Sequence, residues 1–274
     1  MNNVQILNLS IDNFSIAELL QKLETDGGTV FTPNVDHLMQ LQTDSEFYDI
    51  YKTCNYCVCD SKILLYVSKF LGQPLKEKIS GSDLFPAFYN HFSQCEETTI
   101  FLLGAAEGVA RKAQENINHK VGREMVVDSY SPPFGFENDE EECQYIIDRI
   151  NRSGATVLAA GLGTPKQEKW IAKYKKQLKN VRIFLAIGAT IDFEAGEKPR
   201  APKWISEAGL EWMYRLSIEP QRLWKRYLIA DLPFFWLVLQ QKFNLYRGPG
   251  KEVFGESVFR EDTEDTFEEQ QAIA

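Results

Sequence analysis

The sequence lacks the features of several classes of protein. Its 274 residues include only five cysteines and three histidines, and the first residues do not form the basic and then apolar segment of a secretory signal. The apolar run PFFWLVL at 233–239 is far shorter than the ~20 residues that cross a bilayer. We therefore expect a cytoplasmic protein with reduced cysteines that lies on a membrane without spanning it.

Motifs for metals and redox cofactors are also missing. Cys54, Cys57 and Cys59 have no second Cys pair or spaced His pair to complete a tetrahedral zinc site, so buried strand cysteines are favoured. No Asp-x-Asp motif precedes residue 248 to hold Mg²⁺ or Mn²⁺ on a nucleotide diphosphate. The glycine turns do not have the GxGxxG spacing of a dinucleotide site. We predict no metal and no cofactor.

The charge is unevenly distributed. The net charge of −9 argues against a nucleic-acid partner. Residues 248–274 hold eight acidic and two basic side chains, whereas 196–247 hold nine basic and five acidic ones among many aromatics. This predicts an α/β catalytic core at 1–195, a basic, aromatic-rich helical appendage at 196–247, and an acidic, disordered tail at 248–274 that catalysis does not need.

The order of the expected elements predicts the fold class. Strands followed by glycine or proline turns and then by helices recur along the core, which indicates a Rossmann-like α/β fold with a mainly parallel sheet and helices on both faces. The N-terminal segment 4–17 is expected to form a strand or hairpin. The other strands are expected within 29–34, 54–60, 98–104, 122–136, 155–161 and 181–188, and the appendage helices at 203–217, 220–230 and 233–246.

Parallel sheets bind ligands at the carboxyl ends of their strands, so the residues there are candidates for the site. They are Thr32, Asn34, Asp60, Gly104, the segment 161–168 and the segment 188–192. In 161–168 the glycines permit close backbone approach, the following helix N-terminus favours an anion, and Lys166 adds a charge. A glycine turn that serves packing alone remains open for this segment and for Gly104.

Asp60 has two interpretations. At a strand end near Thr32 and Asn34 it could act as a general base toward a sugar hydroxyl. Local sequence favours the other interpretation, in which Asp60 caps the helix that begins after Ser61. His37, on a helix beside a turn, is assigned no role.

The appendage carries basic side chains that suit phosphates or anionic lipid headgroups. They are Arg200, Lys203, Arg215, Arg222, Lys225 and Arg226, and a solvated basic face is the simpler alternative. Interleaved aromatic side chains, including Trp204, Trp212, Trp224 and Trp236, favour a membrane interface, although many of them would also suit a core.

Six motifs in order carry a resemblance to a known family. They are TPNVDHLMQLQ (32–42), GSDLFPA (81–87), SPPFGFE (131–137), GLGTPKQEKWI (161–171), RAPKWI (200–205) and GLEWMYRL with EPQRLWKRYL (209–228). Together they resemble the WecG/TagA/CpsF glycosyltransferase family, which includes N-acetylmannosaminyltransferases of teichoic-acid and related polymer synthesis. The resemblance covers nearly all of 30–239.

The resemblance implies an inverting, metal-independent transfer from a UDP-sugar to a polyprenyl-diphosphate-linked sugar at the inner face of the cell membrane. It implies that Asp60 is the base, that Thr32 assists, and that the appendage binds the membrane and completes the site. The expected donor contacts are Asn34, Gly104, Gly161, Gly163, Pro165, Lys166, Gln167, Glu168 and Asp192. The expected contacts to the acceptor or diphosphate are Lys78, Arg215, Arg222, Lys225 and Arg226. The sugar and the oligomeric state, a homo-oligomer included, stay open.

Two positions depart from the family pattern, which has glycine where this chain has Ser61 and arginine where it has Lys78. A serine could cap a helix or crowd the site, and a lysine keeps the charge without a bidentate fork. These departures leave open a second hypothesis, a non-catalytic nucleotide-binding partner at the membrane surface. A third, a dinucleotide-dependent oxidoreductase, rests on the glycine turns alone.

Overall fold

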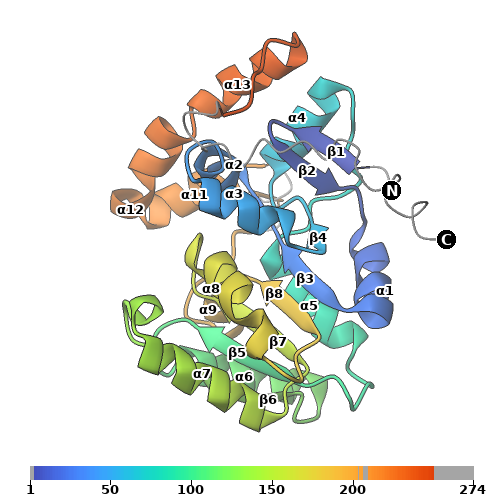
Figure 1. Ribbon diagram of the computed structural model, residues 1–274, viewed down its shortest axis with the longest axis vertical. Coiled ribbons are helices and arrows are strands. Elements are labelled where there is room, and N and C mark those ends of the chain that lie inside the picture. The colour runs from blue at the N-terminus through green and yellow to red at the C-terminus, as the bar shows by residue number, and fades with distance from the viewer. Residues whose placement is uncertain (1–2, 203, 206–208, 250–274) are drawn as a thin grey trace, which may run out of the picture.

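The computed structural model describes residues 3–202, 204–205 and 209–249, without the side chains of residues 215, 222 and 228. The sequence-based division at 247/248 leaves the predicted tail almost wholly outside the described residues, along with Lys203. Within them the chain forms an α/β fold whose central sheet lies between layers of helices (Figure 1). The predicted fold class is confirmed.

An antiparallel hairpin opens the chain. Its strands are β1 (Asn3–Ile6) and β2 (Leu9–Asp12), and helix α1 (Ile16–Asp26) follows. Ser15 caps α1 in a capping box, because its side chain accepts from the Glu18 N–H while Glu18 accepts from the Ser15 N–H. The predicted N-terminal hairpin is confirmed.

The central sheet has six parallel strands in the order β4-β3-β8-β7-β5-β6. Their bounds are β3 (Gly28–Phe31), β4 (Tyr56–Cys57), β5 (Ile100–Gly104), β6 (Val126–Tyr130), β7 (Val157–Gly161) and β8 (Ile183–Ala186). Alternate residues face opposite layers: on β5, Phe101 and Leu103 belong to one hydrophobic cluster and Ile100 and Leu102 to the other. Burial on both faces explains the continuous apolar runs in the sequence.

Two groups of helices cover the sheet. One layer contains α2 (Val35–Gln40), α3 (Ser45–Lys52), α4 (Lys62–Leu71), α7 (Glu140–Ser153) and α8 (Lys166–Tyr174). The other contains α1, α5 (Gly81–His91), α6 (Val109–Val121) and α9 (Thr190–Glu194), and short 3₁₀ turns η1 (Phe136–Asn138) and η2 (Lys175–Gln177) complete the core. Helices that leave β5 and β7 therefore lie on opposite faces, which opens a crevice between these neighbouring strand ends.

The C-terminal segment is helical and packs against the core. It contains α11 (Glu211–Ile218), α12 (Pro220–Lys225), the π-helical turn η3 (Arg226–Ala230) and α13 (Pro233–Lys242). Helix α13 lies beside α4 and the N-terminal hairpin (Figure 1), and Phe234 and Val238 are buried in the core cluster. The Gln241 side chain accepts from the Leu7 N–H at 2.8 Å, and Tyr246 donates to Gln42 at 2.7 Å.

Three expectations differ from the structure. The strand predicted at 54–60 comprises only Tyr56 and Cys57, although the N–H of Val58 still donates to the Phe31 carbonyl. Helix α7 was not predicted at all. The helix predicted at 233–246 ends at Lys242. No helix within the described residues combines the length and apolarity that crossing a bilayer requires.

Candidate active site

Two cavities meet at Lys62, Lys78 and Glu211, between the core and the C-terminal helices. The first, here the Asp60 cavity, has a volume of about 400 Å³. Its core wall carries Asn34, Asp36, Asp60, Lys62 and Lys78, and its other wall carries Trp212, Arg226, Tyr227, Asp231, Leu232 and Phe235. The second, here the Arg200 cavity, has about 730 Å³ and extends past Arg200 and Tyr214. A carboxylate thus lies opposite an apolar wall with basic groups beside it.

Backbone bonds fix Asp60 at the edge of the sheet. Its N–H donates to the Pro33 carbonyl at 2.9 Å, which holds the residue beside the loop after β3. The Cys59 carbonyl accepts from Ile79 at 2.7 Å on the other side. Asp60 therefore follows β4 by three residues and does not end it, contrary to the sequence-based prediction, yet it lies where a strand-end residue would.

Ser61, not Asp60, caps helix α4. The Ser61 hydroxyl accepts from the N–H groups of Ile63 and Leu64 at 3.2 and 3.5 Å. The interpretation that local sequence favoured for Asp60 is therefore wrong, because the next residue supplies the cap. The serine that departs from the family pattern has a structural function, and the Asp60 carboxyl remains at the cavity wall.

Lys78 joins three acidic residues. Its Nζ lies 2.8 Å from Asp83 and 3.9 Å from Glu211. Burial alone would lower the pKa of Lys78, but the bond to Asp83 and the charges of Asp60 and Glu211 raise it above its usual value. Asp83 in turn bonds Arg200 from the segment before α11. The basic group predicted at position 78 is charged and half enclosed beside Asp60.

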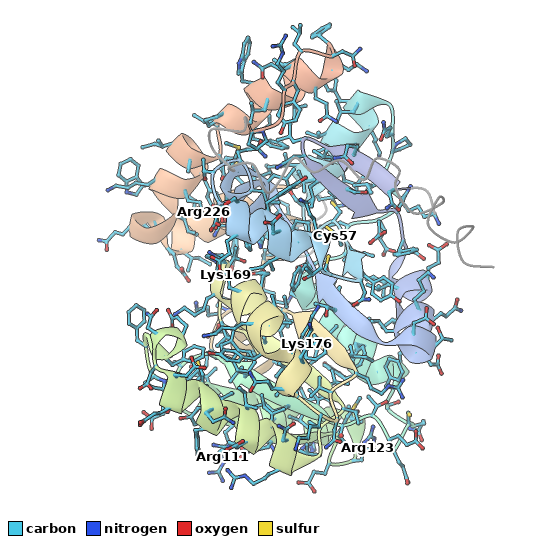
Figure 2. All side chains as sticks on the ribbon, viewed as in Figure 1. Cys57, Arg111, Arg123, Lys169, Lys176 and Arg226 are labelled. Carbon is cyan, nitrogen blue, oxygen red and sulfur yellow. The ribbon has the colours of Figure 1, made fainter. Side chains whose placement is uncertain are left out.

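Arg226 reaches from η3 to the core. Its guanidinium lies 3.0 Å from the Asp36 carboxylate on α2, and Figure 2 labels it where the C-terminal helices meet α2. Asp36 also accepts from Gln40 at 2.7 Å. Asp231, which follows η3, is 8% exposed, and its burial together with the charge of Asp36 raises its pKa to about 6. The sequence gave no signal for Asp36 or Asp231.

A buried polar network connects the loops after β3, β7 and β8. Asn34 caps α2 and its side chain lies 2.9 Å from His37 Nδ1, while His37 Nε2 lies 2.7 Å from the Thr164 hydroxyl. Glu168 accepts from Thr164 at 3.2 Å and from Gln167 at 2.9 Å. Thus His37, which the sequence left without a role, joins two of the predicted motifs.

Gln167 completes the network at the third loop. Its side chain accepts from the Gly188 N–H at 3.1 Å. Gln167 and Glu168 are 4% and 1% exposed, so both side chains lie beneath the site surface and bond to the protein. Their contact with a donor stays a prediction, and the packing of the loops is what these contacts explain.

The carboxyl ends of β5, β7 and β8 approach one another backbone to backbone. A Cβ on Gly104 would lie 2.4 Å from the Gly161 carbonyl, and one on Gly161 would lie 2.6 Å from the Gly188 carbonyl. Side chains are therefore excluded at the first two positions. Gly163 has open space around it but a φ of +80°. The packing interpretation explains Gly104 and Gly161, and backbone conformation explains Gly163.

A third cavity, here the Lys166 cavity, opens at the crevice between β5 and β7. It has a volume of about 740 Å³ and is lined by Gly104, Gly161, Lys166 and the loop 131–134. Lys166 follows Pro165, the N-cap of α8, and its Nζ lies 2.6 Å from Glu137 and 5.1 Å from the ring centre of Phe134. The Phe134 side chain is fully exposed. The helix N-terminus and the lysine suit an anionic ligand.

The structure brings most of the predicted residues to these cavities, but not all. Thr32 is buried at the end of β3, one residue before Pro33. Asp192 is half-buried on α9 and lines none of the three cavities, and neither does Lys225, which is exposed beside Trp224. The side chains of Arg215 and Arg222 lie outside the described residues. The roles of all four stay predictions.

Comparison with known proteins identifies the family. Residues 4–248 match the family described as "Glycosyl transferase WecG/TagA/CpsF family". The chain therefore belongs to this family and is a glycosyltransferase, as the six motifs indicated. It is 25% identical over 239 residues to "N-acetylglucosaminyldiphosphoundecaprenol N-acetyl-beta-D-mannosaminyltransferase" of Staphylococcus aureus strains MRSA252 and NCTC 8325 / PS 47, covering 85% of this chain and 90% of each relative.

Proposed function

We propose that this glycosyltransferase moves an N-acetylmannosamine-like sugar from a UDP-sugar to an N-acetylglucosamine joined through a diphosphate to a polyprenyl lipid. The names of the relatives supply the transferred sugar and the acceptor. The observation that carries the proposal is the position of Asp60 in a cavity with a polar core wall and an apolar wall from the C-terminal helices. An acceptor with a sugar at one end and a lipid at the other matches these two walls.

The donor belongs at the Lys166 cavity in this proposal. Its diphosphate would face the N-terminus of α8 and the Lys166 ammonium, and its base would stack on the exposed Phe134 ring. β4 and β7 are three places apart in the sheet, roughly 14 Å at ~4.8 Å per strand. A nucleotide-diphosphate sugar is long enough to extend its sugar from one site toward the other.

The reaction follows from Asp60 as general base. Its carboxylate takes the proton of an acceptor hydroxyl while that oxygen bonds to the anomeric carbon of the donor. The bond from that carbon to the diphosphate oxygen breaks on the opposite face, so the configuration inverts and UDP leaves with the electron pair. Lys166 and the α8 N-terminus stabilise the leaving group, and we propose that no metal takes part.

The lipid belongs on the side of the C-terminal helices. Large apolar side chains are at least 40% exposed there, namely Trp204, Leu210, Met213, Ile218, Trp224, Ile229, Leu232, Phe235, Trp236, Leu239, Phe243 and Leu245. Such a concentration of aromatic and aliphatic side chains suits the interface of a bilayer. We propose that this face rests on the cytoplasmic leaflet, where the lipid-linked acceptor is found.

The substitution Asp60→Asn tests the assignment. We expect UDP affinity to stay within about twofold of the unaltered protein while transfer falls by at least 10²–10⁴-fold, the usual contribution of general base catalysis. Asp148→Asn, at an exposed carboxylate on α7, is the matched control and should leave both quantities unchanged. Full transfer by Asp60→Asn would show that another group is the base.

A further inference from the structure

Two buried polar atoms face each other's surroundings in the Asp60 cavity without a hydrogen-bond partner. Within the described part of the chain, Asp231 Oδ1 and Arg226 Nε are both buried and unpaired. Both residues line the cavity, and the Asp231 N–H donates to the Arg226 carbonyl at 2.9 Å, which fixes their backbones side by side. One atom is a hydrogen-bond acceptor and the other is a donor.

This arrangement costs stability in the empty protein. A buried polar atom without a partner loses the hydrogen bonds that water would provide. Asp231 also lies near Asp36, whose negative charge opposes its own. Arg226 uses its terminal nitrogen on Asp36, so that bond does not satisfy its Nε. The pair is therefore arranged for a ligand better than for the fold.

The position of the pair selects among ligand groups. Asp231 and Arg226 share the cavity with Asp60, so their ligand belongs to the molecule whose hydroxyl Asp60 would deprotonate. A phosphate has no N–H or, when ionised, O–H to donate, and two neighbouring carboxylates would repel it. An amide offers a donor and an acceptor on separate atoms, matching one carboxylate oxygen and one guanidinium N–H.

We propose that Asp231 and Arg226 bind the acetamido group of the acceptor sugar. The amide N–H donates to Asp231 Oδ1, and the amide carbonyl accepts from Arg226 Nε. This inference rests on the proposed function, and it makes Asp231 a specificity-determining residue for a 2-acetamido acceptor. It also reassigns Arg226, which the sequence placed at the diphosphate, and leaves the diphosphate to Lys62, Lys78 and Arg200 in the adjoining cavity.

The test compares two acceptors that differ only at this group. Lipid-diphosphate N-acetylglucosamine and lipid-diphosphate glucose are assayed with one donor, and the ratio of their kcat/KM values is the readout. We expect Asp231→Ala to lower this preference by about tenfold or more, since a hydrogen bond to a charged group is commonly worth that factor. The change should appear in the KM of the acceptor and leave the KM of the donor unaltered.

Two further variants separate recognition from folding. Asp231→Asn keeps an acceptor oxygen and should retain most of the preference, whereas Asp148→Ala removes an exposed carboxylate on α7 and should change nothing. Asp231→Ala should melt at no lower temperature than the unaltered protein. A large fall in melting temperature, or an unchanged acceptor preference, would overturn the inference.

Binding measurements keep this inference separate from the proposed function. Titration calorimetry with each short-chain acceptor measures the same preference without turnover. If the unaltered protein binds the acetamido acceptor more tightly and Asp231→Ala removes that difference, the inference holds even where Asp60→Asn disproves the assigned base. If the preference that changes is for a 2-acetamido donor, the group that Asp231 binds belongs to the donor and the inference is wrong.

Discussion

His37 Nε2 lies 2.7 Å from the Thr164 hydroxyl, and this contact joins the loop after β3 to the loop after β7 across the intervening strand β8. The two loops carry the TPN and GTPKQE motifs, which are 127 positions apart at these residues. Through Asn34 on one side and Glu168 on the other, the bond couples the candidate catalytic edge to the start of α8.

Loss of His37 should therefore weaken the fold. His37→Ala leaves Glu168 buried without one of its polar neighbours, and we expect the free energy of unfolding to fall by about 1–3 kcal/mol. Urea denaturation followed by circular dichroism measures it. His119→Ala, on the exposed side of α6, is the control and should change the value by less than about 0.5 kcal/mol. Equal stability of the two variants would show that the network is dispensable.

Adjacent phenylalanines on α13 offer a second, matched comparison. Phe234 is fully buried in the core cluster, whereas Phe235 is 48% exposed and lines the Asp60 cavity. We expect Phe234→Ala to cost about 3–5 kcal/mol of unfolding free energy, because it leaves a cavity between α13 and the core. Phe235→Ala should cost about 0.5 kcal/mol or less.

The same pair separates packing from substrate binding. Phe235→Ala should raise the KM for a lipid-linked acceptor several-fold, since it removes part of the apolar wall, while the KM for the donor stays constant. If Phe234→Ala unfolded no more readily than Phe235→Ala, α13 would not be held to the core as described.

The pKa of Asp231 predicts a pH dependence of stability. The groups that face it are Asp36 and His37 on α2 and Arg226 on η3. Its pKa is about 6 in the folded protein and near its ordinary value of 3.8 when unfolded, so between these values the folded state holds the proton more tightly. Asp231 therefore stabilises the fold in acid, and this contribution is lost as the pH rises from about 4 to about 6.

A difference measurement isolates that contribution. The melting temperature of Asp231→Asn minus that of the unaltered protein should be near zero at pH 4, rise through pH 6 and level off above about pH 7, because the other titrating groups are common to both. A difference that is constant with pH, or one that falls as the pH rises, would show that the pKa of Asp231 is not raised.

Much of the core could be predicted from local sequence. The strands β3, β5, β7 and β8 are buried on both faces, so their apolar runs ending in glycine or proline were sufficient signals. Helix α7 was predictable in principle, since Cys143, Ile146, Ile147 and Ile150 have helical spacing, but its charged first turn hid the pattern. The strand β4 was overestimated because residues 58–60 continue its direction while leaving the regular ladder.

The site was only partly predictable, for a different physical reason. Asp60, Lys78 and Lys166 follow strands or lie in motifs, so the sheet topology alone places them at one edge. Asp36 and Asp231 acquire their importance only when η3 packs against α2, a contact between residues far apart in the chain. Likewise, the burial of Gln167 and Glu168 depends on His37, and no pattern within their own motif indicates it.

The most direct test is acceptor-dependent release of UDP. A panel of UDP-sugars is incubated with the protein, with and without short-chain lipid-diphosphate N-acetylglucosamine, at low detergent and without divalent metal. The account predicts release from one donor, the N-acetylmannosamine derivative, only when the acceptor is present, and its loss in Asp60→Asn. Absence of acceptor-dependent release from every donor, or release that requires a divalent metal, would contradict it.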